Sequence, residues 1–174
     1  MLQEEFEKTG KWLFRWRSYF PLTLIGVILL GLRHSEGPYH SQMGDELWEI
    51  IWPMISLLGV VIRIYTIGYT PRGTSGQNTR RQEAEVLNTT GAYSVVRHPL
   101  YLGNFFILLG ISMFAGLWWI SLISILAFWL YYERIMFAEE AFLRRKFGKE
   151  YEEWANKTPA FLPRLKNWKR PQLQ

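Results

Sequence analysis

Four hydrophobic runs, separated by polar connections, dominate the pattern of this chain of 174 residues. They occupy residues 16–32, 47–69, 100–114 and 117–136. A membrane-spanning helix needs roughly 20 apolar residues, so the second and fourth runs are long enough, whereas the first and third are short. Only Ala115 and Gly116 separate the last two runs, which predicts a tight helical hairpin. The pattern predicts an all-α integral membrane helical bundle of about four transmembrane helices.

The segments outside these runs are polar and charged. Residues 1–17 mix acidic, basic and aromatic side chains without a clear signal-peptide cleavage site, so we expect this segment to be retained. After Phe137 the sequence predicts a charged amphipathic helix that continues to about Asn156, and a basic tail with prolines follows. We therefore divide the chain into an N-terminal membrane part with two spans, residues 1–69, and a second half, residues 70–174, with a loop, the hairpin and the C-terminal helix.

The distribution of basic residues indicates how the spans are oriented. Of 20 lysines and arginines, four lie up to Arg17, one in the first connection, four between Arg72 and Arg97, none in the hairpin turn and nine after Met136. The remaining two, Arg63 and Arg134, lie within hydrophobic runs. Basic and nearly uncharged connections alternate, as the positive-inside rule requires when both termini are cytoplasmic. We expect an integral protein of a bacterial or archaeal inner membrane. Topology then explains the net charge of +5, and no nucleic-acid partner is needed.

Composition narrows the possible chemistry. The chain has no cysteine, which excludes disulfides and thiolate metal sites. Its three histidines, His34, His40 and His98, lack the spacing of metal ligands, so we expect no metal site. Nine tryptophans, among 17% aromatic residues, are typical of the aromatic belts at membrane interfaces.

Polar residues gather at the start of the third hydrophobic run. Pro99 is favoured in the first turn of a helix because the N–H that it lacks would be unpaired there. Arg97 and His98 therefore precede a helix N-terminus, whose free N–H groups and dipole attract anions such as carboxylates. Tyr101 follows His98 by three residues, so the two side chains can share one face. The alternative is an interfacial anchor, with Arg97 snorkelling and Tyr101 in the aromatic belt.

Two adjacent glutamates have different surroundings by helical spacing. Glu140 has Arg144 four residues later, which favours an exposed ion pair. Glu139 has apolar residues three and four positions away, and a carboxylate on an apolar face is costly unless it is paired or bound. The alternative for Glu139 is a contact with Arg97 or Arg134.

Five short motifs follow one another in the second half of the chain. They are Gly91-Ala92-Tyr93, Arg97-His98-Pro99-Leu100-Tyr101, Glu139-Glu140, Phe147-Gly148-Lys149-Glu150-Tyr151 and Phe161-Leu162-Pro163. In this order and spacing they resemble the isoprenylcysteine carboxyl methyltransferase family, whose wider group includes the phospholipid N-methyltransferases. The resemblance covers about residues 78–163. It implies a small helical membrane bundle whose C-terminal half, here residues 70–174, binds S-adenosylmethionine on the cytosolic side.

The resemblance also implies roles for particular residues. In the carboxyl methyltransferases an arginine four residues before the first cofactor glutamate contacts the substrate; here that position is Ile135, and Arg134 lies one residue away, about 100° round the helix. We assign Arg97, His98 and Arg134 as catalytic candidates. An amine acceptor would need a general base, for which His98 or Glu140 are candidates, whereas a carboxylate or phosphate would need none. The residues implied to line the cofactor site are Leu87, Tyr93, His98, Pro99, Leu100, Tyr101, Glu139 and Glu140.

The sequence therefore predicts an S-adenosylmethionine-dependent methyltransferase that acts on a membrane lipid or lipidated acceptor. Arg72, Arg80 and Arg81 precede Tyr93, and arginine grips phosphate bidentately, so we assign them to the substrate and predict an anionic phosphate or carboxylate oxygen as acceptor. The alternative is that these arginines only reflect the positive-inside rule and contact anionic lipid headgroups. Phospholipid N-methylation and isoprenylcysteine-type carboxyl methylation stay open. So do two non-enzymatic classes: a small transporter subunit, which should show polarity across a helix midplane, and a purely structural membrane protein.

Overall fold

The computed structural model describes residues 2–16, 19, 22–23, 26, 42–71, 73–74 and 84–171. Over these residues it contains helices and no strand, which confirms the all-α prediction. A single isolated bridge pairs Thr74 with Val86 in this part of the chain. The elements are α1 (Leu2–Trp16), α3 (Gln42–Gly68), α4 (Ala92–Val95), α5 (Pro99–Phe114), α6 (Trp118–Phe147), α7 (Lys149–Lys157) and the 3-10 turn η1 (Leu165–Asn167).

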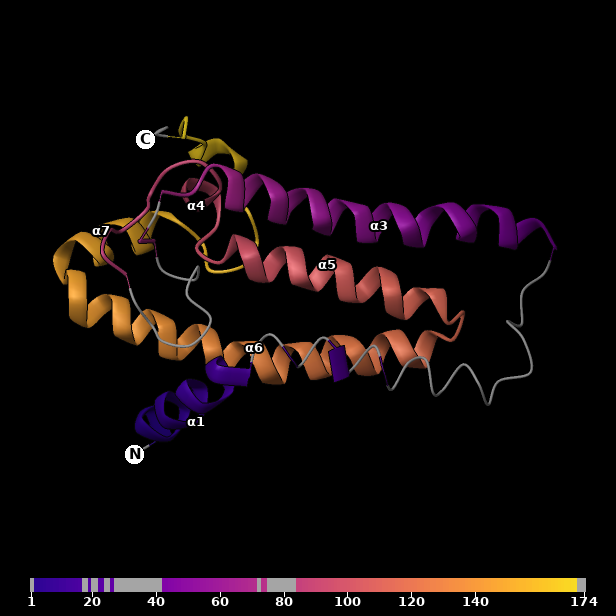
Figure 1. The fold of residues 1–174 in the computed structure, drawn as a ribbon, viewed down its shortest axis with the longest axis horizontal. Coiled ribbons are helices and arrows are strands. Elements are labelled where there is room, and N and C mark those ends of the chain that lie inside the picture. The colour runs from indigo at the N-terminus through magenta and orange to yellow at the C-terminus, as the bar shows by residue number, and fades with distance from the viewer. Residues whose placement is uncertain are drawn as a thin grey trace.

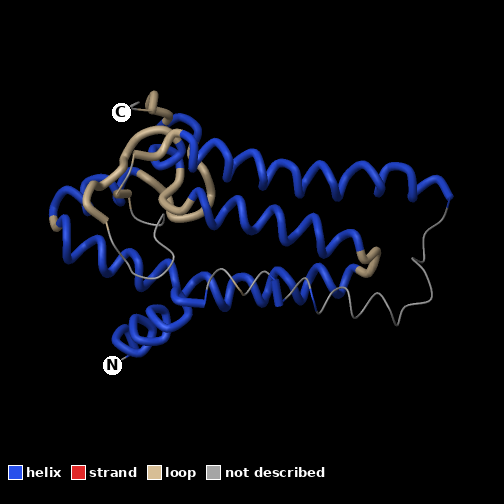
Figure 2. The backbone as a smooth tube through the Cα atoms, viewed as in Figure 1, coloured by secondary structure: helices blue, strands red, loops and turns tan. Residues whose placement is uncertain are grey.

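Three helices, α3, α5 and α6, lie side by side along the long axis of the molecule (Figures 1 and 2). By length and composition, α3 and α6 can each cross a membrane, whereas α5 has 16 residues. The outer face of α3 is apolar and exposed, as expected of a helix surrounded by lipid. These features confirm a membrane helical bundle. The first predicted span, residues 16–32, falls almost wholly outside the described residues.

One predicted boundary is wrong. The sequence predicted a single amphipathic helix from Phe137 to about Asn156, but α6 continues from the membrane segment to Phe147 and α7 is a separate helix. Gly148 separates them with φ of 53° and ψ of −122°, a conformation that L side chains rarely adopt. The glycine turns α7 away from the axis of α6 (Figure 1). This turn brings α7 towards α4 and the start of α5.

Helices α3 and α5 pack closely because glycines face the contact. A Cβ atom on Gly59 of α3 would lie 2.5 Å from the carbonyl oxygen of Gly103 on α5. A Cβ on Gly110 would lie 2.7 Å from the backbone nitrogen of Ser56. Small residues at such positions let two membrane helices approach backbone to backbone. The contact fixes the position of α5, whose N-terminus carries the polar motif.

Helix α1 runs antiparallel to the C-terminal half of α6. The Glu7 carboxylate accepts a hydrogen bond from Arg145 at 2.9 Å, and the Leu13 carbonyl accepts one from Tyr131 at 2.9 Å. Phe14 is buried in the main hydrophobic cluster. The charged and aromatic N-terminal segment is therefore an amphipathic helix docked along the bundle.

The Glu7 contact predicts a small pH-dependent contribution to stability. Hydrogen bonds from Arg145 and Lys11 lower the pKa of Glu7 from its ordinary 4.5 to about 2. A lowered pKa in the folded state stabilises above the unfolded pKa and is lost as the pH falls towards the folded one. Both cations are half-exposed, so we expect Glu7→Gln to cost less than about 1 kcal/mol at pH 7 and less still at pH 2.5.

Thermal unfolding of the Glu7→Gln variant at the two pH values, with Glu5→Gln as the exposed control on the same helix, measures this contribution. An equal cost at pH 7 and pH 2.5 would show that the carboxylate of Glu7 is not stabilised by its two cations.

The C-terminal segment is not a free basic tail. The Arg97 N–H donates to the Pro159 carbonyl at 2.9 Å, and the Arg164 N–H donates to the Val95 carbonyl at 2.9 Å. Phe161 is buried, and its ring lies 4.7 Å from that of Trp129 on α6. Residues after α7 therefore pack back across α4 and the start of α5 and hold both in place.

Candidate functional site

A pocket opens at the end of the bundle where α5 begins and α6 ends, near α7. Its space, counted out to the open side, is about 490 Å³. One wall comes from the loop before α4, which the Glu85 N–H closes by donating to the Gly73 carbonyl at 2.7 Å. The lining residues are Thr74, Val86, Leu87, Asn88, Tyr93, Arg97, His98, Pro99, Leu100, Tyr101, Glu139, Leu143, Tyr151 and Trp154.

Helix α5 begins at Pro99, as the sequence predicts, and His98 is its N-cap residue. No side chain caps this end, so the first N–H groups of α5 stay available at the pocket wall. The His98 and Tyr101 rings stack with their centroids 5.5 Å apart, which confirms that the two side chains share a face. Local helix geometry thus sets a histidine, a tyrosine and a positive helix end at one side of the pocket.

Glu139 comes from α6 on the opposite side. Its carboxylate is buried, with 5% of the residue exposed, and accepts a hydrogen bond from the Tyr101 hydroxyl at 2.9 Å. The Nδ1 atom of His98 lies 3.8 Å from the same oxygen. The partners of Glu139 thus include Tyr101 on α5 and the N-cap residue His98. The pocket thus contains a buried carboxylate next to two aromatic rings.

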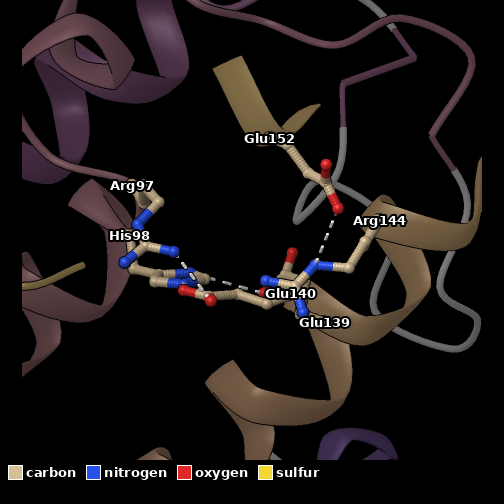
Figure 3. A network of polar contacts seen from close by, with 6 residues as sticks. All are labelled: Arg97, His98, Glu139, Glu140, Arg144 and Glu152. Atoms are coloured by element: carbon tan, nitrogen blue, oxygen red, sulfur yellow. Dashed lines mark hydrogen bonds and ion pairs between the residues drawn. The ribbon is translucent and has the colours of Figure 1, made fainter. Parts of the chain in front are cut away.

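Glu140 contacts Arg97 and His98, the two residues just before α5. The prediction of an exposed ion pair between Glu140 and Arg144 is therefore wrong. Its carboxylate accepts hydrogen bonds from Arg97 Nη1 at 2.7 Å and from His98 Nε2 at 3.0 Å (Figure 3). Arg144 instead lies 3.9 Å from Glu152. An exposed ion pair between residues four apart on a helix contributes only a few tenths of a kcal/mol. Hydrogen bonds from two partly buried donors to the Glu140 carboxylate are stronger, so they determine where this side chain lies. Glu140 does not line the pocket; it holds Arg97 and His98, which do.

Two buried polar atoms at the pocket lack a partner among the described residues: the Tyr151 hydroxyl and Nε of Arg97. Tyr151 is fully buried. Burial and the nearby Glu140 carboxylate raise the pKa of Tyr151 well above its ordinary value, so its hydroxyl keeps its proton and can donate. A buried donor is costly to leave unpaired, so both atoms are candidates to donate to a polar ligand in the pocket.

The sequence assigned no role to several pocket residues. Tyr151 belongs to a quoted motif but was given no function, and nothing in the pattern singled out Trp154, whose indole donates to the Tyr93 carbonyl at 3.0 Å. Both come from α7, whose placement depends on the turn at Gly148. The other unassigned lining residues are Thr74, Val86, Asn88 and Leu143.

Some predicted site residues are not brought to the pocket. The Arg134 guanidinium lies over the Phe6 ring of α1, 5.4 Å from its centroid, and does not line the pocket. Arg134 therefore lies on the side of α6 that contacts α1. Arg72, Arg80 and Arg81 lie outside the described residues. Within the described part of the chain, no group of three or more His, Cys, Asp or Glu side chains is arranged to hold a metal ion.

The fold and the pocket define a small membrane bundle with a polar site at one end. The model of the phospholipid methyltransferase family matches residues 51–150, more than half of the chain. The chain therefore belongs to this family, which confirms the resemblance drawn from the motifs. No solved structure matches the chain.

Curated relatives carry two kinds of name. The chain is 34% identical over 142 residues to the nickel-cobalt-cadmium resistance protein NccN of Alcaligenes xylosoxydans xylosoxydans, covering 82% of this chain and 62% of that protein. It is 33% identical to the cobalt-zinc-cadmium resistance protein CzcN of Cupriavidus metallidurans, covering 70% and 56%. It is 35% identical to the protein-S-isoprenylcysteine O-methyltransferase of Schizosaccharomyces pombe, covering 49% and 36%. The chain thus spans less than two thirds of these relatives.

Proposed function

We propose that this chain is an integral membrane methyltransferase that binds S-adenosylmethionine in the pocket and methylates an anionic oxygen on a membrane lipid or lipidated acceptor. One observation carries the proposal. All the residues that the resemblance assigns to the cofactor, except Glu140, line one pocket. Glu140 forms hydrogen bonds with Arg97 and His98, which line this pocket. The name of the fission-yeast relative, an O-methyltransferase of isoprenylcysteine, supports an oxygen acceptor on a lipidated molecule.

The pocket offers groups that fit each part of the methyl donor. Buried Glu139 can accept hydrogen bonds from an ammonium or from ribose hydroxyls. The uncapped start of α5, the Tyr151 hydroxyl and Nε of Arg97 can donate to a carboxylate. The faces of Tyr93 and Tyr101 can contact a sulfonium, an attraction of roughly 0.5–2 kcal/mol. The buried donors without partners are the features of the pocket that a carboxylate would satisfy.

When bound, S-adenosylmethionine supplies a methyl carbon on a sulfonium, so that a bond from the acceptor oxygen to that carbon forms as the carbon–sulfur bond breaks and the electron pair stays on sulfur. The protein orients the two reactants and excludes water. Arg97 and His98 are held by Glu140 at the pocket edge, where they can position an anionic acceptor. A carboxylate or phosphate is already nucleophilic, so no side chain has to remove a proton.

The proposal is tested by binding and then by transfer. S-adenosylhomocysteine should bind the detergent-purified protein with a dissociation constant of micromolar order, measured by calorimetry. Absence of binding would favour a transporter subunit or a structural protein. Radiolabelled methyl should then appear in lipids extracted from membranes that contain the protein, and mild base should release it. Label on a base-stable headgroup nitrogen would replace the oxygen acceptor with an amine, for which His98 is placed to act as base.

Removal of the Tyr151 hydroxyl gives a sharper test of the proposed methyl-donor site. Because this hydroxyl has no partner among the described residues, Tyr151→Phe should leave the melting temperature unchanged or slightly raise it. If the hydroxyl binds the ligand, the variant should bind S-adenosylhomocysteine about 5- to 10-fold more weakly, the effect of one hydrogen bond. Tyr69→Phe, at an exposed tyrosine, is the matched control. Equal affinities in both variants would remove Tyr151 from the site.

A further inference from the structure

A positive charge lies inside the membrane-spanning helix α3. Arg63 is five residues before the end of α3 at Gly68, which at 1.5 Å per residue is roughly 7–8 Å from the helix end. Val60 and Ile67, three residues before Arg63 and four after it on the same side of α3, are exposed apolar side chains, so this side of α3 can meet lipid. A charged residue at such a depth is costly and usually pairs or marks a functional site.

The side chain of Arg63 is held in one place. A Cβ on Gly103 would lie 2.6 Å from Cγ of Arg63, so the arginine stem rests against the bare backbone of α5 at this glycine. The Arg63 guanidinium donates a hydrogen bond to the side-chain carbonyl of Asn104. Gly103 and Asn104 together hold the Arg63 guanidinium against α5. An arginine that only extends to the membrane surface would not need these two contacts.

Side-chain contacts, first polar and then aromatic, continue from Arg63 to the pocket. The Asn104 amide donates to the Tyr132 hydroxyl at 3.1 Å. The Tyr132 ring lies 5.0 Å from the ring of Tyr101, which lines the pocket. Asn104 follows Tyr101 by three residues on α5, so the guanidinium is attached about one helical turn from the pocket. Arg63 thus lies between the lipid-facing surface of α3 and the proposed methyl-donor site.

The charge of Arg63 is not neutralised by the part of the chain that the structure describes. Asn104 and Tyr132 are both neutral, and no ion pair of Arg63 with a carboxylate occurs among the described residues. A guanidinium has five N–H donors and suits a carboxylate or phosphate bidentately. A membrane lipid beside this part of α3 could supply such an anion.

We propose that Arg63 binds the anionic headgroup, phosphate or carboxylate, of the membrane lipid that accepts the methyl group. The proposal rests on the proposed function and adds to it a residue and a charge requirement for the acceptor. Arg63 grips the headgroup from the side of α3, while the acyl chains lie along the exposed apolar face of that helix. Asn104 and Tyr132 position the guanidinium and connect it to the pocket wall.

The test measures lipid selectivity without requiring turnover. The protein is reconstituted in vesicles of phosphatidylcholine, and spin-labelled phosphatidic acid is compared with spin-labelled phosphatidylcholine by electron paramagnetic resonance. The wild type should prefer the anionic lipid, and Arg63→Gln should lower this preference at least threefold. Glutamine can still hydrogen-bond Asn104, so the fold is retained while the charge is lost. Arg63→Lys, which keeps the charge, should retain part of the preference.

Matched controls separate this inference from others. Arg15→Gln removes one exposed positive charge from α1 and should leave the preference unchanged. An excess of inorganic phosphate should not compete, and competition would show that the site takes a soluble anion instead of a lipid. An unchanged preference in Arg63→Gln, with normal binding of S-adenosylhomocysteine, would overturn this inference alone. Failure of the wild type to bind S-adenosylhomocysteine would overturn the proposed function, and the lipid preference would still be measured.

Discussion

Glu139→Ala is expected to weaken the binding of S-adenosylhomocysteine by about 30- to 100-fold. Glu139 is buried in the pocket, where its carboxylate accepts a hydrogen bond from Tyr101 and faces the space in which the ligand's ammonium or hydroxyls would bind. A hydrogen bond that involves a charged group contributes about 1.5–3 kcal/mol, and 1.4 kcal/mol corresponds to a factor of ten. Truncation also leaves the Tyr101 hydroxyl without its acceptor. Calorimetry on the purified variant measures the loss.

Glu133→Ala is the matched control for Glu139→Ala. Glu133 is an exposed carboxylate on the same helix, six positions earlier, and does not line the pocket. Its removal changes the net charge of the protein equally, so any effect of charge alone appears in both variants. If both variants bind S-adenosylhomocysteine as tightly as the wild type, the buried carboxylate does not contact the ligand and the site must be placed elsewhere.

Features set by local sequence were predicted correctly. A proline at the first helical position and a three-residue spacing are enough to predict the start of α5 and the stacking of His98 on Tyr101. Hydrophobic length predicted α3 to within a few residues, as residues 47–69 against Gln42–Gly68. Each rule involves residues within one turn or one helix. None needs knowledge of what the helix packs against.

Features set by contacts between distant segments were missed. The spacing of Glu140 and Arg144 describes one helix, but Arg97 and His98 approach from 42 or 43 residues away and replace that pair. The same holds for Tyr151 and Trp154, which reach the pocket only because Gly148 turns α7 back. Phe161 was part of a motif, yet its burial against Trp129 depends on how the C-terminal segment crosses the bundle. Chain topology, not local pattern, decides these contacts.

The close packing of α3 on α5 predicts that a larger side chain at the contact lowers the stability of the protein. Gly59→Ala should lower the free energy of unfolding by about 2–3 kcal/mol. The new Cβ would lie 2.5 Å from the Gly103 carbonyl and 2.7 Å from the Ile107 nitrogen, both backbone atoms that move only if the helices separate. Overpacking of this kind typically costs 1–3 kcal/mol, and it exceeds the gain of up to about 1 kcal/mol from replacing glycine in a helix.

Gly68→Ala, on the same helix, is the matched control because no atom lies within 4 Å of its added Cβ. It makes the same chemical change without the clash, so it should leave stability unchanged or raise it slightly. Unfolding of both variants in one detergent, followed by helical circular dichroism, gives the comparison. Separation of α3 from α5 would also displace Arg63 from Gly103 and shift the N-terminus of α5, so Gly59→Ala should weaken both anionic-lipid preference and S-adenosylhomocysteine binding. Equal stability of the two variants would mean that α3 and α5 do not meet at Gly59.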